Sequence, residues 1–107
     1  MTTGGGVGDG EATEVSRPGK VAKAVVVHGR VQGVFFRDTC RREARSAGIA
    51  GWVSNEPDDT VRAHFEGSPE AVDAMVAWAR RGPEHALVTG VDVEDAAVAG
   101  HDGFEVR

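Results

Sequence analysis

The stretch Val25–Asp38, with the sequence VVVHGRVQGVFFRD, changes character within a few residues. Its three consecutive valines, followed by Gly29, indicate a central strand that is covered on at least one face. Apolar residues then recur at helical spacing, at Phe36, Cys40, Ala44 and Ala47, and Gly48 fits a C-terminal cap. This pattern predicts a helix over about 35–47. A strand that passes through a glycine-bracketed loop directly into a helix restricts the chain to folds built on strand–helix crossovers.

Further strand and helix patterns follow along the chain. The segments 49–55 and 60–67 are predicted as the strands of a hairpin, whose second strand has one apolar face and one solvent-exposed face of Arg62, His64 and Glu66. Ser68 as N-cap and Pro69 at the first helical position predict a helix over about 69–80. The segments 86–95 and 103–107 are predicted as strands, with an irregularity near Gly90 where the alternation slips by one residue.

The order of these patterns, β-α-β-β-α-β, predicts a fold class. With right-handed crossovers it gives an α+β, ferredoxin-like sandwich: an antiparallel sheet with two helices on one face, plus a short C-terminal strand. Residues 21–107 are predicted to form this one domain, because a chain of 107 residues suits a single core. Residues 1–20 are rich in glycine and nearly free of large apolar side chains, which predicts a flexible N-terminal tail.

Charge and cysteine content exclude several classes of protein. Seventeen acidic and twelve basic residues give a net charge of −5, the wrong sign for a protein held mainly by nucleic-acid phosphates or an anionic membrane. The apolar runs are too short for a membrane-spanning helix. Cys40 is the only cysteine, and His64, His85 and His101 are scattered without ligand spacing, so we expect neither a disulfide nor a metal site. His28 precedes the loop without a second histidine, an acid or a metal set beside it in the motif, which favours a strand-end residue over a phosphohistidine nucleophile. We expect a cytoplasmic monomer without a nucleic-acid or membrane partner.

Arg37 lies where helix electrostatics disfavour a cation. The N-terminus of a helix carries roughly +0.5 of a charge, so an arginine in the first turn costs about 0.3–1 kcal/mol unless an anion offsets it. Backbone N–H groups between strand and helix can converge on such an anion, and Gly29 and Gly33 permit the backbone angles required. A glycine pair at this spacing is a weak signal alone. Arg37, whose guanidinium can bind two phosphate oxygens, makes a phosphate site the better interpretation.

Two ordered motifs carry a family resemblance. GRVQGVFFR (29–37), followed by GWVSN (51–55) and a closing GFEVR (103–107), resembles the acylphosphatase family over residues 21–107. The resemblance implies the same fold, no metal or cofactor, and Arg37 and Asn55 as catalytic residues, with Asn55 orienting the attacking water. It also implies that the loop backbone and Arg37 bind the phosphoryl group, through Gly29, Arg30, Val31, Gln32, Gly33, Val34, Phe35 and Arg37.

The implied enzyme is an acylphosphatase, which hydrolyses small acyl phosphates to a carboxylate and inorganic phosphate, the latter also an inhibitor. A carboxylate leaving group, with a conjugate acid of pKa about 4–5, needs no general acid, so positioning and charge stabilisation suffice. The alternative is a non-catalytic ferredoxin-like module that binds an anion or another ligand, because a fold alone decides no function. The related domain of the hydrogenase-maturation carbamoyltransferases is a further alternative, but without a sequence beyond Arg107 we expect a free enzyme.

The sequence departs from the family pattern at two points. Asp58-Asp59 stands where the family commonly has Asp-Gly, so we expect a slightly strained hairpin. Glu56 puts a carboxylate directly after Asn55. It either points toward the phosphate site and repels the substrate or faces solvent in the turn before Pro57, and the sequence leaves both possibilities open.

Overall fold

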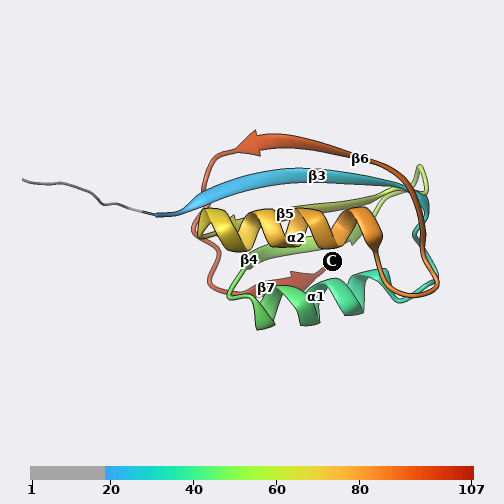
Figure 1. The fold of residues 1–107 in the computed structure, drawn as a ribbon, viewed down its shortest axis with the longest axis horizontal. Helices are drawn as coiled ribbons and strands as arrows, with labels where there is room; N and C mark the ends of the chain where they lie inside the picture. Colours follow the sequence, from blue (N-terminus) through green and yellow to red (C-terminus); the bar gives the residue numbers. More distant parts are fainter. Residues whose placement is uncertain (1–18) are drawn as a thin grey trace, which may run out of the picture.

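The structure, a computed structural model, describes residues 19–107 as two layers, a sheet and a pair of helices (Figure 1). The strands are β3 (Val21–Arg30), β4 (Ala50–Asn55), β5 (Val61–Gly67), β6 (Leu87–Ala96) and β7 (Phe104–Val106), and the helices are α1 (Phe36–Ser46) and α2 (Pro69–Arg81). Their order and bounds confirm the elements predicted from the sequence. The predicted tail, residues 1–20, falls almost entirely outside the described residues.

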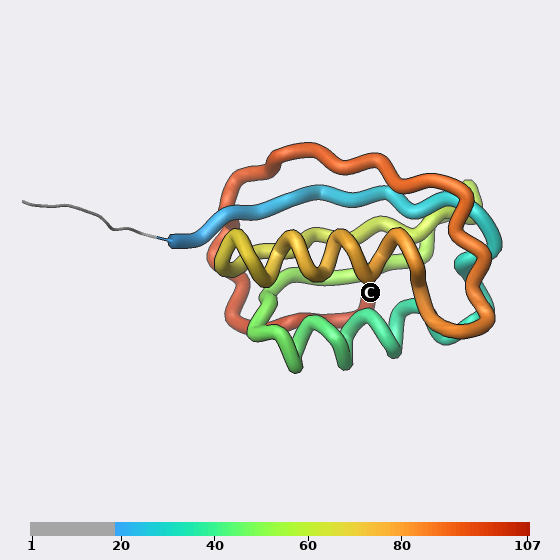
Figure 2. Tube along the Cα trace, viewed as in Figure 1, coloured from blue at the N-terminus to red at the C-terminus, as the bar shows by residue number. Residues whose placement is uncertain are grey.

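The sheet has the strand order β6-β3-β5-β4-β7 and is antiparallel except at one edge. There β7 pairs with β4 in parallel, so the short C-terminal strand makes the sheet mixed. The direction of β7 follows from its connection. Residues 97–103 carry the chain from the β6 edge across to the β4 edge, and the reversal leaves β7 antiparallel to β6 and hence parallel to β4 (Figure 2).

Both helices cover the same face of the sheet, as predicted. α2 packs over β3, β5 and β6, and α1 packs over β4 and β7. Alternate strand residues face them and are buried, among them Val25, Val27, Val53, Ala63 and Phe65. The rings of Phe36 and Trp78 join the two helices at a centroid distance of 5.1 Å. Neither helix in residues 19–107 is long and apolar enough to cross a membrane.

The helix ends match the predicted caps. After α1, the left-handed Gly48 (φ +72°) allows its own N–H to reach Arg45 O at 3.3 Å and the next N–H to reach Ala44 O at 2.8 Å. These paired bonds form a Schellman motif. At the start of α2, Ser68 Oγ accepts the N–H of Ala71 at 3.2 Å. Both caps are local, which explains why the sequence alone predicts them.

A β-bulge lies where β3 leaves the sheet. His28 pairs with Gly90 but Gly29 pairs with Val88, so Thr89 is an additional residue in β6, which confirms the irregularity predicted near Gly90. Gly29 has a φ of +123°, and a Cβ built on it would lie 2.1 Å from Leu87 O. Only glycine fits this crossing, which directs the chain into the loop 31–35.

The face of β5 away from the helices is less exposed than its alternation predicts. Glu66 is 3% exposed because the connection 97–103 folds over this end of the sheet. Its carboxylate accepts hydrogen bonds from the N–H groups of Ala99, Gly100 and His101 at 2.7–3.0 Å. It also accepts one from Nε2 of His64 at 2.7 Å. Burial would raise the pKa of Glu66, but these donors outweigh it and lower the pKa to about 2. The prediction of a solvent-exposed face is therefore wrong at Glu66.

We expect Glu66→Gln to destabilise the protein. The amide would direct an N–H group toward backbone donors that need an acceptor, at a cost of about 1–3 kcal/mol in the free energy of unfolding. Urea unfolding measures the effect, with Glu94→Gln, an exposed carboxylate on β6, as the control. An unchanged midpoint for Glu66→Gln would mean that its hydrogen bonds contribute nothing to stability.

The turn between β4 and β5 carries the expected strain. Asp59 has a φ of +70°, in the left-handed region, whereas Asp58 Oδ1 accepts both the N–H and the hydroxyl of Thr60. Asp59→Gly should therefore raise stability by about 0.5–1 kcal/mol, because a left-handed conformation costs glycine nothing. Asp58→Ala should lower the melting temperature, because it removes the acceptor. Opposite shifts of melting temperature are expected, and shifts of the same sign would contradict this account of the turn.

Candidate active site

An open pocket of ≈ 340 Å³ lies at the end of the sheet where β3 leads into α1. Its walls come from three parts of the chain, the loop and first turn of α1, the end of β4 and the end of β7: Gly33, Phe35, Phe36, Arg37, Asp38, Asn55 and Val106. Arg37 and Asn55, which the sequence places on different elements, therefore line the same pocket.

The loop 31–35 turns sharply before the helix. Gly33 and Phe35 both have left-handed backbone angles, with φ of +73° and +62°. Phe35 is the N-cap of α1 and provides no side-chain hydrogen bond to the first turn. The first intrahelical hydrogen bond joins Thr39 N–H to Phe35 O. The N–H groups of Phe36, Arg37 and Asp38 come before it and therefore have no acceptor within the helix. Because these residues line the pocket, the uncapped helix end provides donors and positive potential for an anion.

Arg37 is oriented by the far end of the chain. Its Nη1 donates to Arg107 O at 3.0 Å. That main-chain oxygen is fixed in turn because Arg107 N–H donates to Val53 O at 2.8 Å, beside β4. The guanidinium has five donors, and this is its one hydrogen bond to residues 19–107, so the others remain for a ligand. Arg37 can therefore bind two oxygens of one phosphoryl group.

Asn55 is the last residue of β4 and presents an acceptor without a protein partner. Its Oδ1 is buried and makes no hydrogen bond within the part of the chain that the structure describes. An unpaired buried acceptor is costly, and such groups in native proteins commonly serve a ligand or a bound water. Its place in the pocket wall makes Asn55 suited to accept a hydrogen bond from an O–H donor.

Gln32 joins the loop to the opposite wall. Its Nε2 donates to Glu56 O at 2.8 Å and to Thr60 O at 2.9 Å, the carbonyls on either side of the β4–β5 turn. These bonds fix the position of the loop relative to Asn55. The sequence placed Gln32 in the phosphate-binding loop but gave no indication that its side chain holds the turn.

The remaining predicted residues lie around the pocket without lining it. Gly29 and Arg30 belong to β3 and pair with β6, and Val31 is buried in the core. Val34 is partly buried against the same core. Of the predicted set, the pocket wall thus includes Gly33, Phe35, Arg37 and Asn55. The catalytic and binding roles of all the predicted residues stay predictions.

Glu56 and Phe35 border the site in different ways. The Glu56 carboxylate accepts a hydrogen bond from the Ser54 hydroxyl at 2.7 Å and does not line the pocket, which favours the interpretation that it faces away from a bound phosphate.

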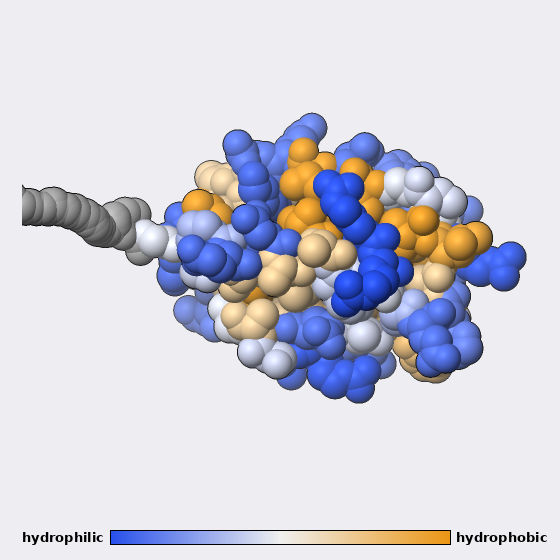
Figure 3. All heavy atoms as spheres, in the orientation of Figure 1, coloured by the Kyte–Doolittle hydropathy of each residue, from blue (hydrophilic) through white to orange (hydrophobic). Residues whose placement is uncertain are grey.

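Phe35 lines the pocket and is 75% exposed. On the helix-covered face, hydrophobic residues gather in the upper middle and toward the right-hand end, the end where α1 begins (Figure 3). Because it is exposed in the pocket wall, Phe35 offers apolar surface beside Arg37 and the first turn of α1.

The fold and the pocket define a ferredoxin-like α+β protein with a pocket between an uncapped helix and the end of a strand, whose donors suit an anion. A family model described as Acylphosphatase matches residues 23–106. The chain belongs to the acylphosphatase family.

Known proteins of this family resemble the chain over most of its length. An acylphosphatase of Rubrobacter xylanophilus is 52% identical over 98 residues, which are 91% of this chain and 88% of that protein. Among solved structures, an acylphosphatase from Coxiella burnetii has a TM-score of 0.81 at 32% identity, covering 83% of this chain and 94% of its own. One from Bacillus subtilis has a TM-score of 0.79 at 33% identity, covering 81% and 98%. The predicted family, fold and enzyme class are confirmed, and the non-catalytic module receives no support.

Gly29 and Gly33 should respond differently to a methyl group. A Cβ on Gly33 would meet no atom within 4 Å, so Gly33→Ala should fold with a loss of about 1–2 kcal/mol from its left-handed backbone. Because Gly33 lines the pocket, inhibition by inorganic phosphate should weaken by about tenfold or more. Gly29→Ala should lose more stability, because its Cβ would collide with Leu87 O. Melting temperatures and phosphate inhibition constants measure both effects, and equal losses of stability would contradict the account.

Proposed function

We propose that the chain hydrolyses the carboxyl–phosphate bond of small acyl phosphates, with Arg37 binding the phosphoryl group and Asn55 orienting the water that attacks it. The observation that carries the proposal is the shared pocket, where Arg37, the uncapped end of α1 and the unpaired Oδ1 of Asn55 meet. A phosphoryl group offers anionic oxygens to the first two, and a water offers an O–H group to the third.

Binding of the phosphoryl group uses fixed positive groups. The Arg37 guanidinium and the N–H groups of Phe36, Arg37 and Asp38 can face its oxygens, and the hydrogen bond to Arg107 O holds the guanidinium in advance. Groups oriented before the reaction stabilise charge in the transition state without reorganisation. This supports a site that favours the transferring phosphoryl group over a free carboxylate.

The chemical step uses one water molecule as the nucleophile and the residues of this pocket to position it. Asn55 Oδ1 accepts one hydrogen of the water and directs its oxygen toward phosphorus. The oxygen–phosphorus bond forms as the bond to the acyl oxygen breaks, the acyl group leaves as a carboxylate with the bonding electrons, and a phosphoryl oxygen takes the water's proton. Asn55 is too weak a base to take it, and a carboxylate needs no proton to leave.

The pocket also supports a small substrate and a single-chain enzyme. At ≈ 340 Å³ and open to solvent, it holds a phosphoryl group and leaves the acyl group beside exposed Phe35. All the groups in the mechanism come from one chain, which supports a monomer. A single, buried cysteine suits the reducing conditions of the cytoplasm.

Hydrolysis of benzoyl phosphate in the presence of EDTA tests this function. We expect turnover that inorganic phosphate inhibits competitively. A folded protein that binds phosphate but does not hydrolyse benzoyl phosphate would instead be a binding module.

Arg37→Ala should lower kcat/KM by about 10²–10³, or about 3–4 kcal/mol, and leave the melting temperature nearly unchanged. Arg37→Lys should also lower kcat/KM strongly, because the point charge of an ammonium group cannot bind two oxygens as a guanidinium does. Arg41→Ala is the matched control, a nearby arginine of α1 that does not line the pocket. More than about a tenth of the activity remaining in Arg37→Ala would reject its role.

Asn55→Ala should lower kcat strongly and change phosphate inhibition little, because Asn55 acts on the water and not on the phosphoryl group. Steady-state kinetics with a melting curve separates this role from a structural one. If kcat, phosphate binding and melting temperature fall together, Asn55 stabilises the β4–β5 turn and does not orient the water.

A further inference from the structure

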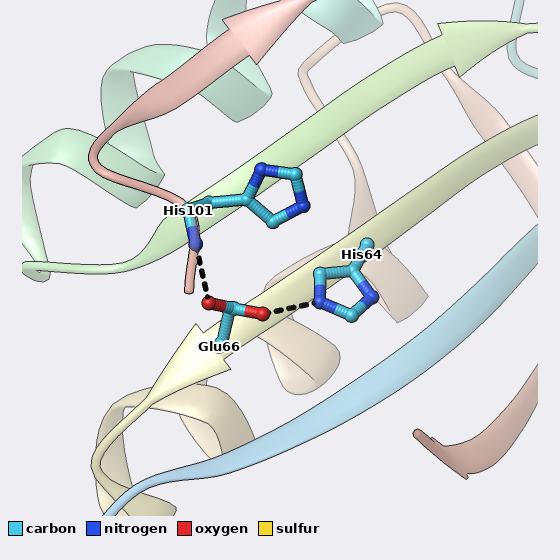
Figure 4. A group of neighbouring side chains, drawn as sticks. All are labelled: His64, Glu66 and His101. Carbon is cyan, nitrogen blue, oxygen red and sulfur yellow. Dashed lines mark hydrogen bonds and ion pairs between the residues drawn. The ribbon is translucent and has the colours of Figure 1, made fainter. Parts of the chain in front are cut away.

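A second cluster of chemically reactive groups lies at the other end of the sheet. His64 and Glu66 project from β5, and His101 projects from the connection that leads to β7 (Figure 4). One ligand atom from each side chain lies within 4.8 Å of the other two. The sequence gave no sign of this cluster, because 35 positions separate Glu66 from His101. The expectation that the histidines are scattered is therefore wrong for His64 and His101.

We infer that His64, Glu66 and His101 bind a divalent transition-metal ion, with zinc as the best match. Two imidazoles and one carboxylate form a donor set that suits zinc and disfavours magnesium or calcium, which prefer oxygen ligands alone. Three protein ligands leave a fourth position for water. Glu66 is also the one carboxylate in residues 19–107 that is grouped with two histidines in this way.

The Glu66 carboxylate is held in a fixed position without a metal ion. Three backbone N–H groups, from Ala99, Gly100 and His101, fix the plane of the Glu66 carboxylate. Metal-binding carboxylates and imidazoles are commonly held by such outer hydrogen bonds. His64 Nε2 donates the remaining bond, to Oε1 at 2.7 Å, and a metal ion would take the place of that proton.

The two imidazoles provide a half-buried but reachable site. The His64 side chain is 12% exposed and stacks on Trp52, with ring centroids 6.4 Å apart. The ring of His101 is half-buried and stands edge-on to His64 at 5.4 Å. Within the described residues no side-chain hydrogen bond holds the His101 ring, so it can rotate toward the ion. Ligands on a tetrahedral zinc ion are about 3.3 Å apart, which is a small adjustment from the present positions.

The ion would be structural and not part of the hydrolysis. The cluster lies on the face of the sheet without helices, and at the opposite end of β5 from Val61, the partner of Asn55. Glu66 lies five positions along the strand from Val61, or roughly 17 Å. A bound ion would tie the connection 97–103 to β5 and so stabilise the fold by mass action.

Zinc titration of the tag-free full chain by calorimetry tests the inference. We expect one ion per chain and a higher melting temperature with excess zinc. His101→Ala removes the ring but keeps the backbone N–H to Glu66, so it should fold and should weaken zinc binding by about tenfold or more. His85→Ala removes an exposed histidine outside the cluster and should bind zinc as the unaltered chain does.

A second readout is independent of affinity. Bound Ni²⁺ should quench the fluorescence of Trp52 through the neighbouring His64, and His101→Ala should need a higher Ni²⁺ concentration for the same quenching. If His101→Ala is unstable without metal, His101→Gln replaces it in both measurements. No zinc bound by the folded chain, or equal binding by the chain and its His101 variant, would overturn the inference.

Discussion

The active site depends on the uncapped N-terminus of α1. A helix end normally satisfies its first N–H groups with a side chain at the N-cap, but here the N-cap is Phe35 in a left-handed conformation. The free N–H groups are unfavourable without an anion and make the neighbouring Arg37 unfavourable too. In the proposed function, a bound phosphoryl group offsets both costs. We propose that the missing side-chain cap is the source of phosphate affinity.

The other groups of the site are held by contacts between distant segments. Gln32 fixes the loop to the β4–β5 turn, and Arg107 O fixes the guanidinium of Arg37. The position of Arg107 depends on β7, and β7 depends on the connection that Glu66 holds at the opposite end of the sheet. The buried carboxylate therefore supports the active site indirectly, through the strand that orients Arg37.

The sequence predicted those features whose causes are local. Gly48, Ser68 and Pro69 mark helix ends, and the slip in alternation near Gly90 marks the bulge, because each acts on its immediate neighbours. Arg37 was singled out by helix electrostatics and Asn55 by motif resemblance, and the structure adds that they share a pocket. The contacts of the Gln32 side chain, the contact of Arg37 with Arg107 O and the burial of Glu66 were missed, because each depends on residues that are distant in the chain. The parallel direction of β7 is likewise a consequence of the whole topology.

In the proposed mechanism, water attacks phosphorus in the pocket of Arg37 and Asn55. Hydrolysis of benzoyl phosphate in ¹⁸O-labelled water, with EDTA present and the products identified by mass spectrometry, shows which bond breaks. We expect the label to enter inorganic phosphate and benzoate to stay unlabelled, because the phosphorus–oxygen bond breaks. Label in benzoate would show attack on the acyl carbon and would rule out this mechanism.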